Sequence, residues 1–259
     1  MFFVALSMLP FPENSSSPGA SSSPYLIGCS GYYYREWKGN FYPEKLPSTQ
    51  WLPFYAQHFN TLEVNATFYR MPTLNGMKKW YAATPPDFQF TVKANQLFTH
   101  YRRMKDVASL QNEFYPVITE GLQEKLACVL YQFPAGVHFS EELLERILPL
   151  GQMPVLHAIE FRHRSWWQEK VYQDFEQAGL VFVNISLPGF PDIFVPNARA
   201  AYLRFHGKPE LYKSAYSTAS LQWWSSQFEA QPAPQLLAYF NNTWHGAAVE
   251  NAKTFRSLL

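Results

Sequence analysis

The sequence predicts an α/β protein with a TIM-type (β/α)8 barrel, a single domain whose outer ring of helices is incomplete. Eight strand-like runs and seven helical segments alternate almost from end to end, which favours parallel strands joined by right-handed crossovers. Eight is the number of strands that closes such a barrel. Seven of the eight runs also place a charged or amide side chain near their carboxyl ends, where barrels of this class carry their active sites.

The strand-like runs are short apolar stretches, many of them bounded by turn-forming residues. They cover residues 25–31, 61–69, 88–95, 126–133, 157–163, 180–186, 200–207 and 235–242. Helical segments lie at 51–59, 76–83, 113–123, 141–150, 168–178, 218–228 and 247–258. Ser140 is placed to cap the fourth of these segments, and Gly179 to end the fifth.

Two features decide how the elements assemble. The link at 187–199 has no helical pattern, so we expect the outer ring to be incomplete there. The alternative fold is a doubly wound open sheet, which usually carries a glycine-rich phosphate loop after its first strand. The first loop of this chain reads GYYYREWKGNFYP instead, and the barrel is therefore the preferred interpretation.

Charge and cysteine content exclude some classes of protein. The 259 residues include 21 Lys and Arg against 20 Asp and Glu, a net charge of +1. This excludes the overall basic excess of many non-specific nucleic-acid binders but leaves a local basic patch open. Both cysteines lie inside strand-like runs, which is typical of a reduced protein and predicts a cytoplasmic location. No segment has the length and composition of a membrane span.

Residues 1–23 are expected to form a flexible Ser/Pro-rich leader, and residues 24–259 the folded domain. Such a composition buries too little apolar surface to offset the entropy of ordering. We therefore predict that a protein beginning at Pro24 melts at the same temperature as the full chain. A melting temperature lower by several degrees would show that the leader packs onto the barrel.

Side chains alternate between the two faces of a strand, so one set in each run should face the barrel interior. The polar side chains near the carboxyl ends fall on one such set, and the opposite set is apolar. The set predicted to face inward contains Ser30, Glu63, Asn65, Lys93, Gln132, Glu160, Arg162, Asn184, Ser186, Arg204, His206 and Asn241.

Several stretches of the chain also resemble a known family. The motifs IGCSGYYYREWKGNFYP, LEVNATFYRMP, FTVKANQLFTH, YQFP, EFRHRSW, LRFHG and YFNNTWHGAAVENA occur in this order. They are similar to those of the YecE-like family, catalogued as domain of unknown function 72. The resemblance runs from about residue 25 to the end of the chain. It implies a TIM-type barrel with an incomplete outer ring, and no established activity.

The inward polar set suggests an enzyme that acts on an anionic ligand at the mouth of the barrel. Three cations, Lys93, Arg162 and Arg204, are suited to hold a phosphate or carboxylate. His206 and Glu160 are the candidate general acid and base, in the manner of a hydrolase or lyase. Further candidates are the third catalytic residue Glu63 and the ligand-binding residues Asn65 and Asn241. The alternative is internal pairing of Glu160 with Arg204, and of Glu63 with Lys93 or Arg162.

Aromatic residues in the predicted loops suggest a second function. Trp37 and Trp166 could stack on a ligand at the mouth, or could seal the top of the barrel. Stacking would suit a non-catalytic module that binds single-stranded nucleic acid. A metal-dependent phosphodiesterase or nuclease is a third possibility, because Glu63, Glu160, His100, His206 and His245 are of metal-ligating types. No metal-binding spacing occurs, so we assign no metal and no cofactor. The expected partner is a small or polymeric anionic ligand.

Overall fold

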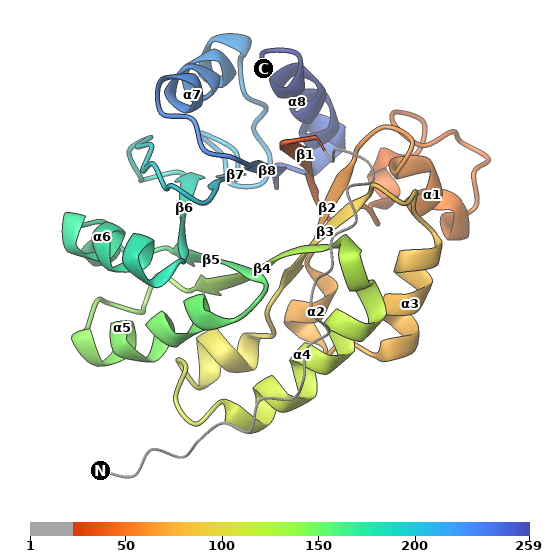
Figure 1. Ribbon diagram of the computed structural model, residues 1–259. Coiled ribbons are helices and arrows are strands. Elements are labelled where there is room, and N and C mark those ends of the chain that lie inside the picture. The colour runs from red at the N-terminus through yellow and green to blue at the C-terminus, as the bar shows by residue number, and fades with distance from the viewer. Residues whose placement is uncertain (1–22) are drawn as a thin grey trace.

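The computed structural model describes residues 23–259, and its eight parallel strands close into one barrel (Figure 1). Each strand pairs with the next along the chain, and β8 returns to pair with β1. The TIM-type fold is therefore confirmed, and the open sheet is excluded. The strands are β1 (Tyr25–Ser30), β2 (Thr61–Val64), β3 (Gln89–Lys93), β4 (Leu126–Phe133), β5 (Leu156–Phe161), β6 (Val181–Ser186), β7 (Ala201–Phe205) and β8 (Leu236–Phe240).

Helices surround the barrel except between β6 and β7, where no helix lies, so the predicted gap in the ring is confirmed. Ser140 caps α5 by accepting a hydrogen bond from Leu143 N, and Gly179 ends α6 in the left-handed conformation. The α-helices are α1 (Trp51–Tyr55), α2 (Ala66–Tyr69), α3 (Leu74–Ala82), α4 (Ala108–Leu122), α5 (Glu141–Ile147), α6 (Glu169–Ala178), α7 (Thr218–Ala230) and α8 (Ala247–Arg256). Shorter helical turns lie at Arg35–Trp37, Ser48–Gln50, Leu97–Tyr101, Gln123–Lys125, Leu148–Gln152, Arg164–Trp166 and Trp244–Gly246.

The second predicted strand is too long, because its last part forms the short helix α2. The β-branched and aromatic residues of this stretch favour a strand, but tertiary hydrogen bonds decide otherwise. Thr67 Oγ1 donates to Lys93 O at 2.6 Å, and Asn95 Nδ2 donates to Thr67 O at 3.0 Å. These bonds join the helical turn after β2 to the end of β3, beside the candidate site.

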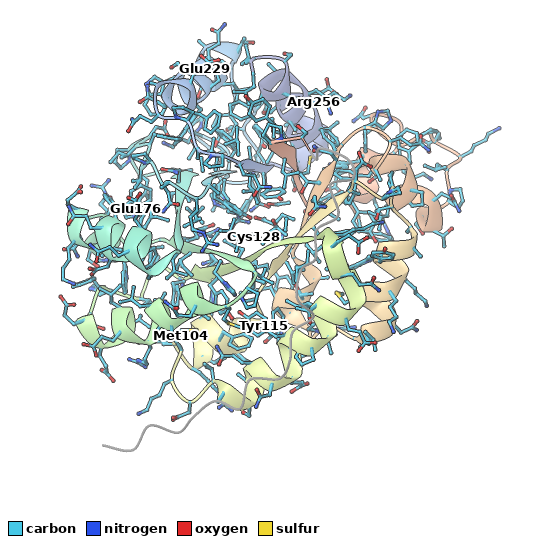
Figure 2. The ribbon with its side chains drawn as sticks, in the orientation of Figure 1. Met104, Tyr115, Cys128, Glu176, Glu229 and Arg256 are labelled. Atoms are coloured by element: carbon cyan, nitrogen blue, oxygen red, sulfur yellow. The ribbon has the colours of Figure 1, made fainter. Side chains whose placement is uncertain are left out.

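The barrel interior is lined mainly by apolar side chains and a few hydrogen-bonded hydroxyl groups, and its charged side chains gather at the carboxyl end. In Figure 2, Cys128 lies inside the barrel, whereas Glu176, Glu229 and Arg256 lie on the outer helices. A larger cluster packs the outer faces of the strands against the helices. The interior cluster consists of Leu26, Cys128, Leu130, Ala158, Val181, Val183, Ile185, Leu187, Ala200, Tyr202, Leu237 and Tyr239.

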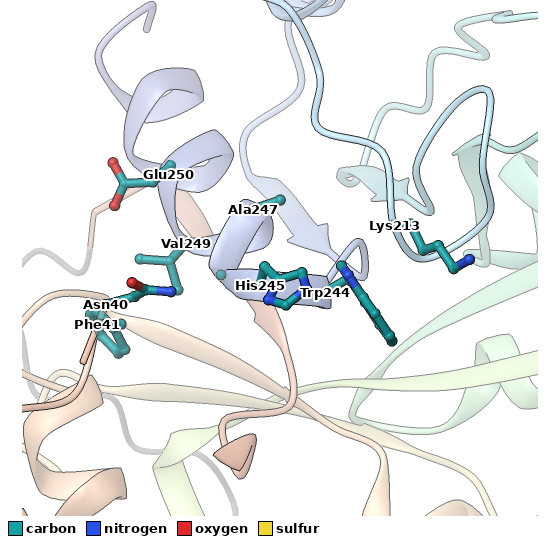
Figure 3. A pocket seen from close by; sticks show the side chains of 9 residues that line it. Asn40, Phe41, Lys213, Trp244, His245, Ala247, Val249 and Glu250 are labelled. Carbon is teal, nitrogen blue, oxygen red and sulfur yellow. The ribbon is translucent and has the colours of Figure 1, made fainter. Parts of the chain in front are cut away.

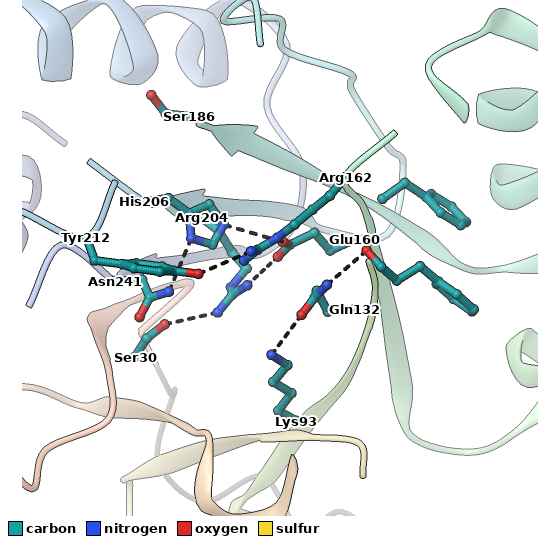
Figure 4. A network of polar contacts seen from close by, with 12 residues as sticks. Ser30, Lys93, Gln132, Glu160, Arg162, Ser186, Arg204, His206, Tyr212 and Asn241 are labelled. Carbon is teal, nitrogen blue, oxygen red and sulfur yellow. Dashed lines mark hydrogen bonds and ion pairs between the residues drawn. The ribbon is translucent and has the colours of Figure 1, made fainter. Parts of the chain in front are cut away.

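One strand has the opposite orientation to the one predicted. In β6, Val183 and Ile185 belong to the interior cluster, so the prediction that Asn184 and Ser186 face inward is wrong. The Asn184 side chain accepts a hydrogen bond from Val195 N at 2.6 Å and donates to Val195 O at 3.2 Å. No helix follows β6, so the link to β7 packs on the outer face of the strand. The side-chain amide of Asn184 satisfies the backbone groups of that link at Val195. Figure 4 shows Ser186 directed away from the polar network of the mouth.

Candidate functional site at the carboxyl end of the barrel

The carboxyl ends of the strands hold a chain of ion pairs that begins at Glu63 on β2. Its two oxygens accept hydrogen bonds from Ser30 Oγ, from Tyr202 OH at 2.6 Å and from Arg204 at 2.6 and 3.0 Å. The side chain has no exposed surface. With both oxygens occupied by donors from β1 and β7, this carboxylate is held as an acceptor and fixes the arginine that faces it.

Arg204, on β7, joins the two buried carboxylates of the site. It donates to Glu63 through Nε and Nη2, to Glu160 through Nη1 and to Ser30 through Nη2. These bonds occupy four of the five N–H groups of a guanidinium, and the residue is only 1 % exposed. Two arrangements were possible for Arg204: pairing with a carboxylate inside the barrel, or exposure to a ligand. The structure contains the internal pairing.

Glu160, on β5, lies between two arginines. Arg162 Nε donates to its Oε1 at 2.7 Å, and Arg204 Nη1 donates to its Oε2. Although burial alone acts to raise the pKa of this carboxyl, the two guanidinium groups hold it well below its usual value. Glu160 therefore stays ionised at neutral pH, and it has no proton to give as a general acid.

His206 follows β7 and is fully buried beside Glu160. Asn241 Nδ2 lies 3.2 Å from its Nδ1; because an amide nitrogen donates, Nδ1 accepts and the ring proton sits on Nε2. Nε2 lies 3.4 Å from Glu160 Oε1 without forming a hydrogen bond. Burial lowers the pKa of His206 to about 4, against the opposing effect of Glu160. The imidazole is thus neutral at physiological pH.

Lys93, at the end of β3, reaches the same mouth without an acidic partner. Its Nζ donates to Gln132 Oε1 at 3.0 Å and lies 4.0 Å from the centre of the Phe68 ring. The residue is 8 % exposed. Burial lowers the pKa of Lys93 to about 7, and the positive charge of Arg204 acts in the same direction. This amine is partly unprotonated at neutral pH.

Arg162 is the arginine of the network that reaches solvent. Its side chain is 18 % exposed, while its Nη1 donates to Tyr212 OH at 3.1 Å. Burial acts to lower its pKa, but the neighbouring Glu160 outweighs it, and the pKa of Arg162 is raised. Figure 4 shows Arg162, Tyr212 and Lys93 around the buried pair of Arg204 and Glu160.

The structure thus brings together six of the ten predicted site residues at the mouth of the barrel, together with Asn241 beside His206. These six are Glu63, Lys93, Glu160, Arg162, Arg204 and His206. Asn65 lies beyond the end of β2 with its Oδ1 buried and without a hydrogen-bond partner. The chemical roles assigned to all of them stay predictions.

The two predicted tryptophans lie apart from this network. Trp37 is fully buried and donates from Nε1 to Thr243 O at 2.8 Å, which joins the first loop to the last. Trp166 is also fully buried; its ring stacks on Phe161 at 3.9 Å and its Nε1 donates to Val137 O. Neither ring has a free face, so both pack the barrel top rather than offering a stacking surface.

Sequence reasoning missed three residues that contact the site. Tyr202 shares its strand face with Arg204, a signal that could have found it. The contact of Phe68 with Lys93 could not be predicted, because the sequence predicts a strand where the helix α2 forms. Tyr212 lies in an irregular loop with a left-handed backbone (φ 64°), and no periodic pattern predicts where such a residue points.

The part of the chain that the structure describes holds no group of three His, Cys, Asp or Glu side chains placed to bind a metal ion. Cys29 and Cys128 are both buried and unpaired. Across residues 23–259, no helix is long and apolar enough to cross a membrane.

Two cavities flank the mouth. One, of about 260 Å³, lies between the first loop and the last two, beside Phe41, Lys213 and Trp244 (Figure 3). The other, of about 450 Å³, is bordered by Glu142, which pairs with Arg146, and by four cations from the loop after β3 and from α5, Arg102, Arg103, Lys105 and Arg146. Basic side chains therefore extend beyond the central network along the same face.

Charge is strongly divided between this face and the rest of the molecule. Seven connections, which follow β1 to β5, β7 and β8 and of which the second includes the short helix α2, cover residues 31–50, 65–73, 94–107, 134–140, 162–168, 206–217 and 241–246. They hold eleven Lys and Arg against four Asp and Glu, a net charge of +7. Because the whole chain carries +1, everything else carries −6. Five exposed aromatic side chains lie in the same connections: Tyr33, Tyr69, Tyr101, Tyr212 and Trp244.

Comparison with known proteins gives a consistent family assignment without an activity. The chain is 28 % identical over 269 residues to UPF0759 protein YunF of Bacillus subtilis, covering 90 % of this chain and 94 % of that protein. A crystal structure of a DUF72 family protein from Thermotoga maritima matches 90 % of this chain and 98 % of its own, with 30 % identity and a TM-score of 0.75. A DUF72 family protein from Enterococcus faecalis, at 20 % identity, shares the fold with a TM-score of 0.76.

The family model described as "Protein of unknown function DUF72" matches residues 26–259. This range contains all eight strands, except for the first residue of β1. It also contains every residue of the site described above. The chain therefore belongs to the DUF72 family.

Proposed function

We propose that this protein is an enzyme that acts on a ligand bearing a phosphate or carboxylate group, bound at the carboxyl end of the barrel. The observation that carries the proposal is the net charge of +7 on the strand-to-helix connections of a chain whose total charge is +1. A surface of one sign around a recessed site attracts ligands of the opposite sign and raises their local concentration.

Within this face, Arg162 and Lys93 are the two nitrogen groups that the ligand would meet, Arg162 as a fixed cation and Lys93 as an amine with a pKa of about 7. Both keep exposed surface, whereas Arg204 is held under them by two carboxylates. Glu63 and Glu160 then act as positioning residues: they fix Arg204, and Glu160 also orients the Arg162 guanidinium. A fork held in this way offers its remaining N–H groups to an anion in a defined direction.

Phosphate is expected to stabilise the protein through Arg162. A ligand that binds the folded state adds about 2.7 kcal/mol to the free energy of unfolding at a concentration a hundredfold above its dissociation constant. Chloride at matched ionic strength should add far less, because it carries a single charge and cannot place a separate acceptor oxygen on each of two parallel N–H groups. Thermal melting with each salt measures the difference.

Arg162→Met tests the residue, and Arg164→Met is the matched control. Arg164 carries the same charge two positions away, but it is exposed and hydrogen-bonds to Gly189 O. We expect Arg162→Met to lose the phosphate-specific increment and Arg164→Met to keep it. Equal increments in both variants would contradict the assignment of the anion site to Arg162.

The five exposed aromatic side chains favour a second candidate, a binding module for single-stranded nucleic acid. They come from the connections after β1, β2, β3, β7 and β8, and bases can stack on such rings while the cations contact phosphates. This function requires oligonucleotide binding that weakens steeply with salt and that falls when Tyr69 and Tyr101 are replaced with Ala. Unchanged oligonucleotide affinity in that double variant would exclude it.

A further inference from the structure

Lys93 differs from the other cations of the network in having no acidic partner. Arg204 and Arg162 both form ion pairs with buried carboxylates. Among the described residues, no carboxylate oxygen lies within 4.0 Å of Lys93 Nζ, and its one hydrogen bond goes to the neutral amide of Gln132. A buried ammonium without a counter-ion is costly, so the position favours a neutral amine.

A second buried lysine shows what a structural role looks like in this chain. Lys125 is 2 % exposed, but its Nζ donates to Tyr81 O and Thr84 O at 2.8 Å each and to Thr84 Oγ1 at 3.2 Å. All three of its N–H groups therefore have acceptors. Lys93 uses one of its three N–H groups in a hydrogen bond and leaves the other two without a protein partner among the described residues. It does so at the mouth of the barrel, whereas Lys125 lies on the outside.

Gln132 fixes this arrangement. Its Nε2 donates to Phe133 O at 2.9 Å, so its Oε1 must be the atom that faces Lys93. The amide accepts a hydrogen bond from the amine but supplies no negative charge. The charged or titratable groups that influence Lys93 are Glu63 on β2, His100 after β3, Glu160 and Arg162 on or after β5, and Arg204 on β7. The carboxylates in this set are already paired with the arginines.

We propose that Lys93 is a nucleophile that forms an imine with an aldehyde or ketone carrying the anionic group. The inference rests on the proposed function, because Arg162 would hold that group. The Nζ lone pair attacks the carbonyl carbon, a C–N bond forms, and the carbonyl oxygen takes up a proton. The amine supplies this proton and then a second one, so that the C–O bond breaks, the hydroxyl leaves as water and the C=N bond forms. No oxidant or reductant is consumed.

Two physical conditions for this chemistry are met. An amine reacts only when it is unprotonated, and a pKa of about 7 for Lys93 leaves a large unprotonated fraction at neutral pH. The product imine becomes a cation when it is protonated, and it then occupies the place that the ammonium of Lys93 occupies over the Phe68 ring.

Reductive trapping with glyoxylate and cyanoborohydride tests the inference. Glyoxylate is a small aldehyde with a carboxylate, and hydride reduction of its imine leaves a stable carboxymethyl group on the lysine. Peptide mass spectrometry then compares Lys93 with the exposed Lys78 and the buried Lys125 in the same sample. At pH 7.5 we expect Lys93 to be modified at least about tenfold faster than Lys78, since an ordinary lysine is about one part in a thousand unprotonated there. Lys125 should also react more slowly than Lys93, because its three N–H groups are held by acceptors away from the mouth.

Gln132→Glu is the decisive variant because it keeps the amine and changes only its partner. A carboxylate at this position would stabilise the ammonium and raise the pKa of Lys93. Modification of Lys93 at pH 7.5 should then fall at least about tenfold and return above pH 9, a shift along the pH axis that a merely disturbed fold would not produce. In the unaltered protein, the rate at Lys93 should reach half its maximum near pH 7.

Modification of Lys93 no faster than that of Lys78, or a rate that still rises above pH 9, would overturn the inference. So would a Gln132→Glu variant with an unchanged pH profile. These outcomes differ from failure of the proposed function, which is read from the phosphate-specific increment and its dependence on Arg162. Lys93 can fail as a nucleophile while phosphate still stabilises the protein.

Discussion

Replacing Arg204 with Met is expected to lower the free energy of unfolding by about 3–5 kcal/mol, measured by denaturant titration without any ligand. The substitution keeps most of the side-chain stem but removes the guanidinium that pairs with Glu63 and Glu160. Both carboxylates have no exposed side-chain surface. They would be left buried with fewer donors, and an unpaired buried charge is among the most destabilising changes a core can carry.

A triple variant separates loss of pairing from loss of packing. Adding Glu63→Gln and Glu160→Gln to Arg204→Met removes the stranded charges while it keeps side chains of similar size. We expect this variant to be more stable than Arg204→Met alone, because neutral amides cost less to bury than carboxylates. A fall of less than about 1 kcal/mol for Arg204→Met, the range of exposed ion pairs, would contradict the buried pairing that the structure shows.

Replacing Lys93 with Met is expected to have the opposite sign and to raise the free energy of unfolding at pH 7 by up to about 4 kcal/mol, the cost of a lysine whose pKa falls from about 10.4 to about 7 on folding. Met fills similar space on the Phe68 ring and carries no charge to desolvate. Residues that are kept for function at a cost in stability behave in this way. The two buried cations of one mouth should therefore respond oppositely, because Arg204 has two carboxylate partners and Lys93 has none.

The stabilisation by Lys93→Met should depend on pH. The pKa of Lys93 is about 7 in the folded protein and about 10.4 in the unfolded chain. Between these values the unfolded chain binds more protons, so the contribution of Lys93 to stability rises with pH. Below pH 7 the lysine is protonated in both states and its penalty is constant. The advantage of Lys93→Met is therefore largest below about pH 7 and shrinks by at most about 1.4 kcal/mol per pH unit between pH 7 and pH 10.

Measuring both proteins at each pH removes the contribution of the buried tyrosines and cysteines, which is common to them. Lys125→Met is the matched control, because that lysine has three acceptors and its loss should destabilise the protein. A destabilised Lys93→Met variant, or a difference in stability that stays constant from pH 7 to pH 10, would show that Lys93 is a satisfied structural lysine.

The fold could be predicted because its signals are local and repeated. Each strand was recognised from its own apolar run, and the missing helix between β6 and β7 from the composition of residues 187–199. The alternation of side chains placed Glu63, Glu160 and Arg204 on one interior face. It failed in β6, where both faces are buried and the polar Asn184 serves the loop outside the barrel. Strands β2 and β7 are equally buried on both faces, so what distinguishes β6 is the polar link to β7 that packs on its outer face where a helix would otherwise lie.

The partners within the site could not be predicted, because they depend on distances across the barrel. Sequence reasoning left Glu63 a choice between Lys93 and Arg162, and the structure pairs it with Arg204. The reason is geometric: one guanidinium on β7 is long enough to reach carboxylates on β2 and β5 at once. The exposure of the aromatic side chains could not be predicted either. Trp37 and Trp166 are buried, while the rings that remain exposed come from loops with no periodic pattern.

The central claim is that the mouth binds an anion through Arg162 and Lys93, above an Arg204 held by its carboxylates. A crystal structure of the protein soaked in tungstate tests it most directly, because the anomalous signal of tungsten locates the anion without ambiguity. The account predicts a peak in contact with Arg162 and Lys93, with the bonds from Arg204 to Glu63 and Glu160 intact. Tungstate bound by Arg204 in place of its carboxylates, or found only in the cavity beside Arg102 and Arg146, would contradict it.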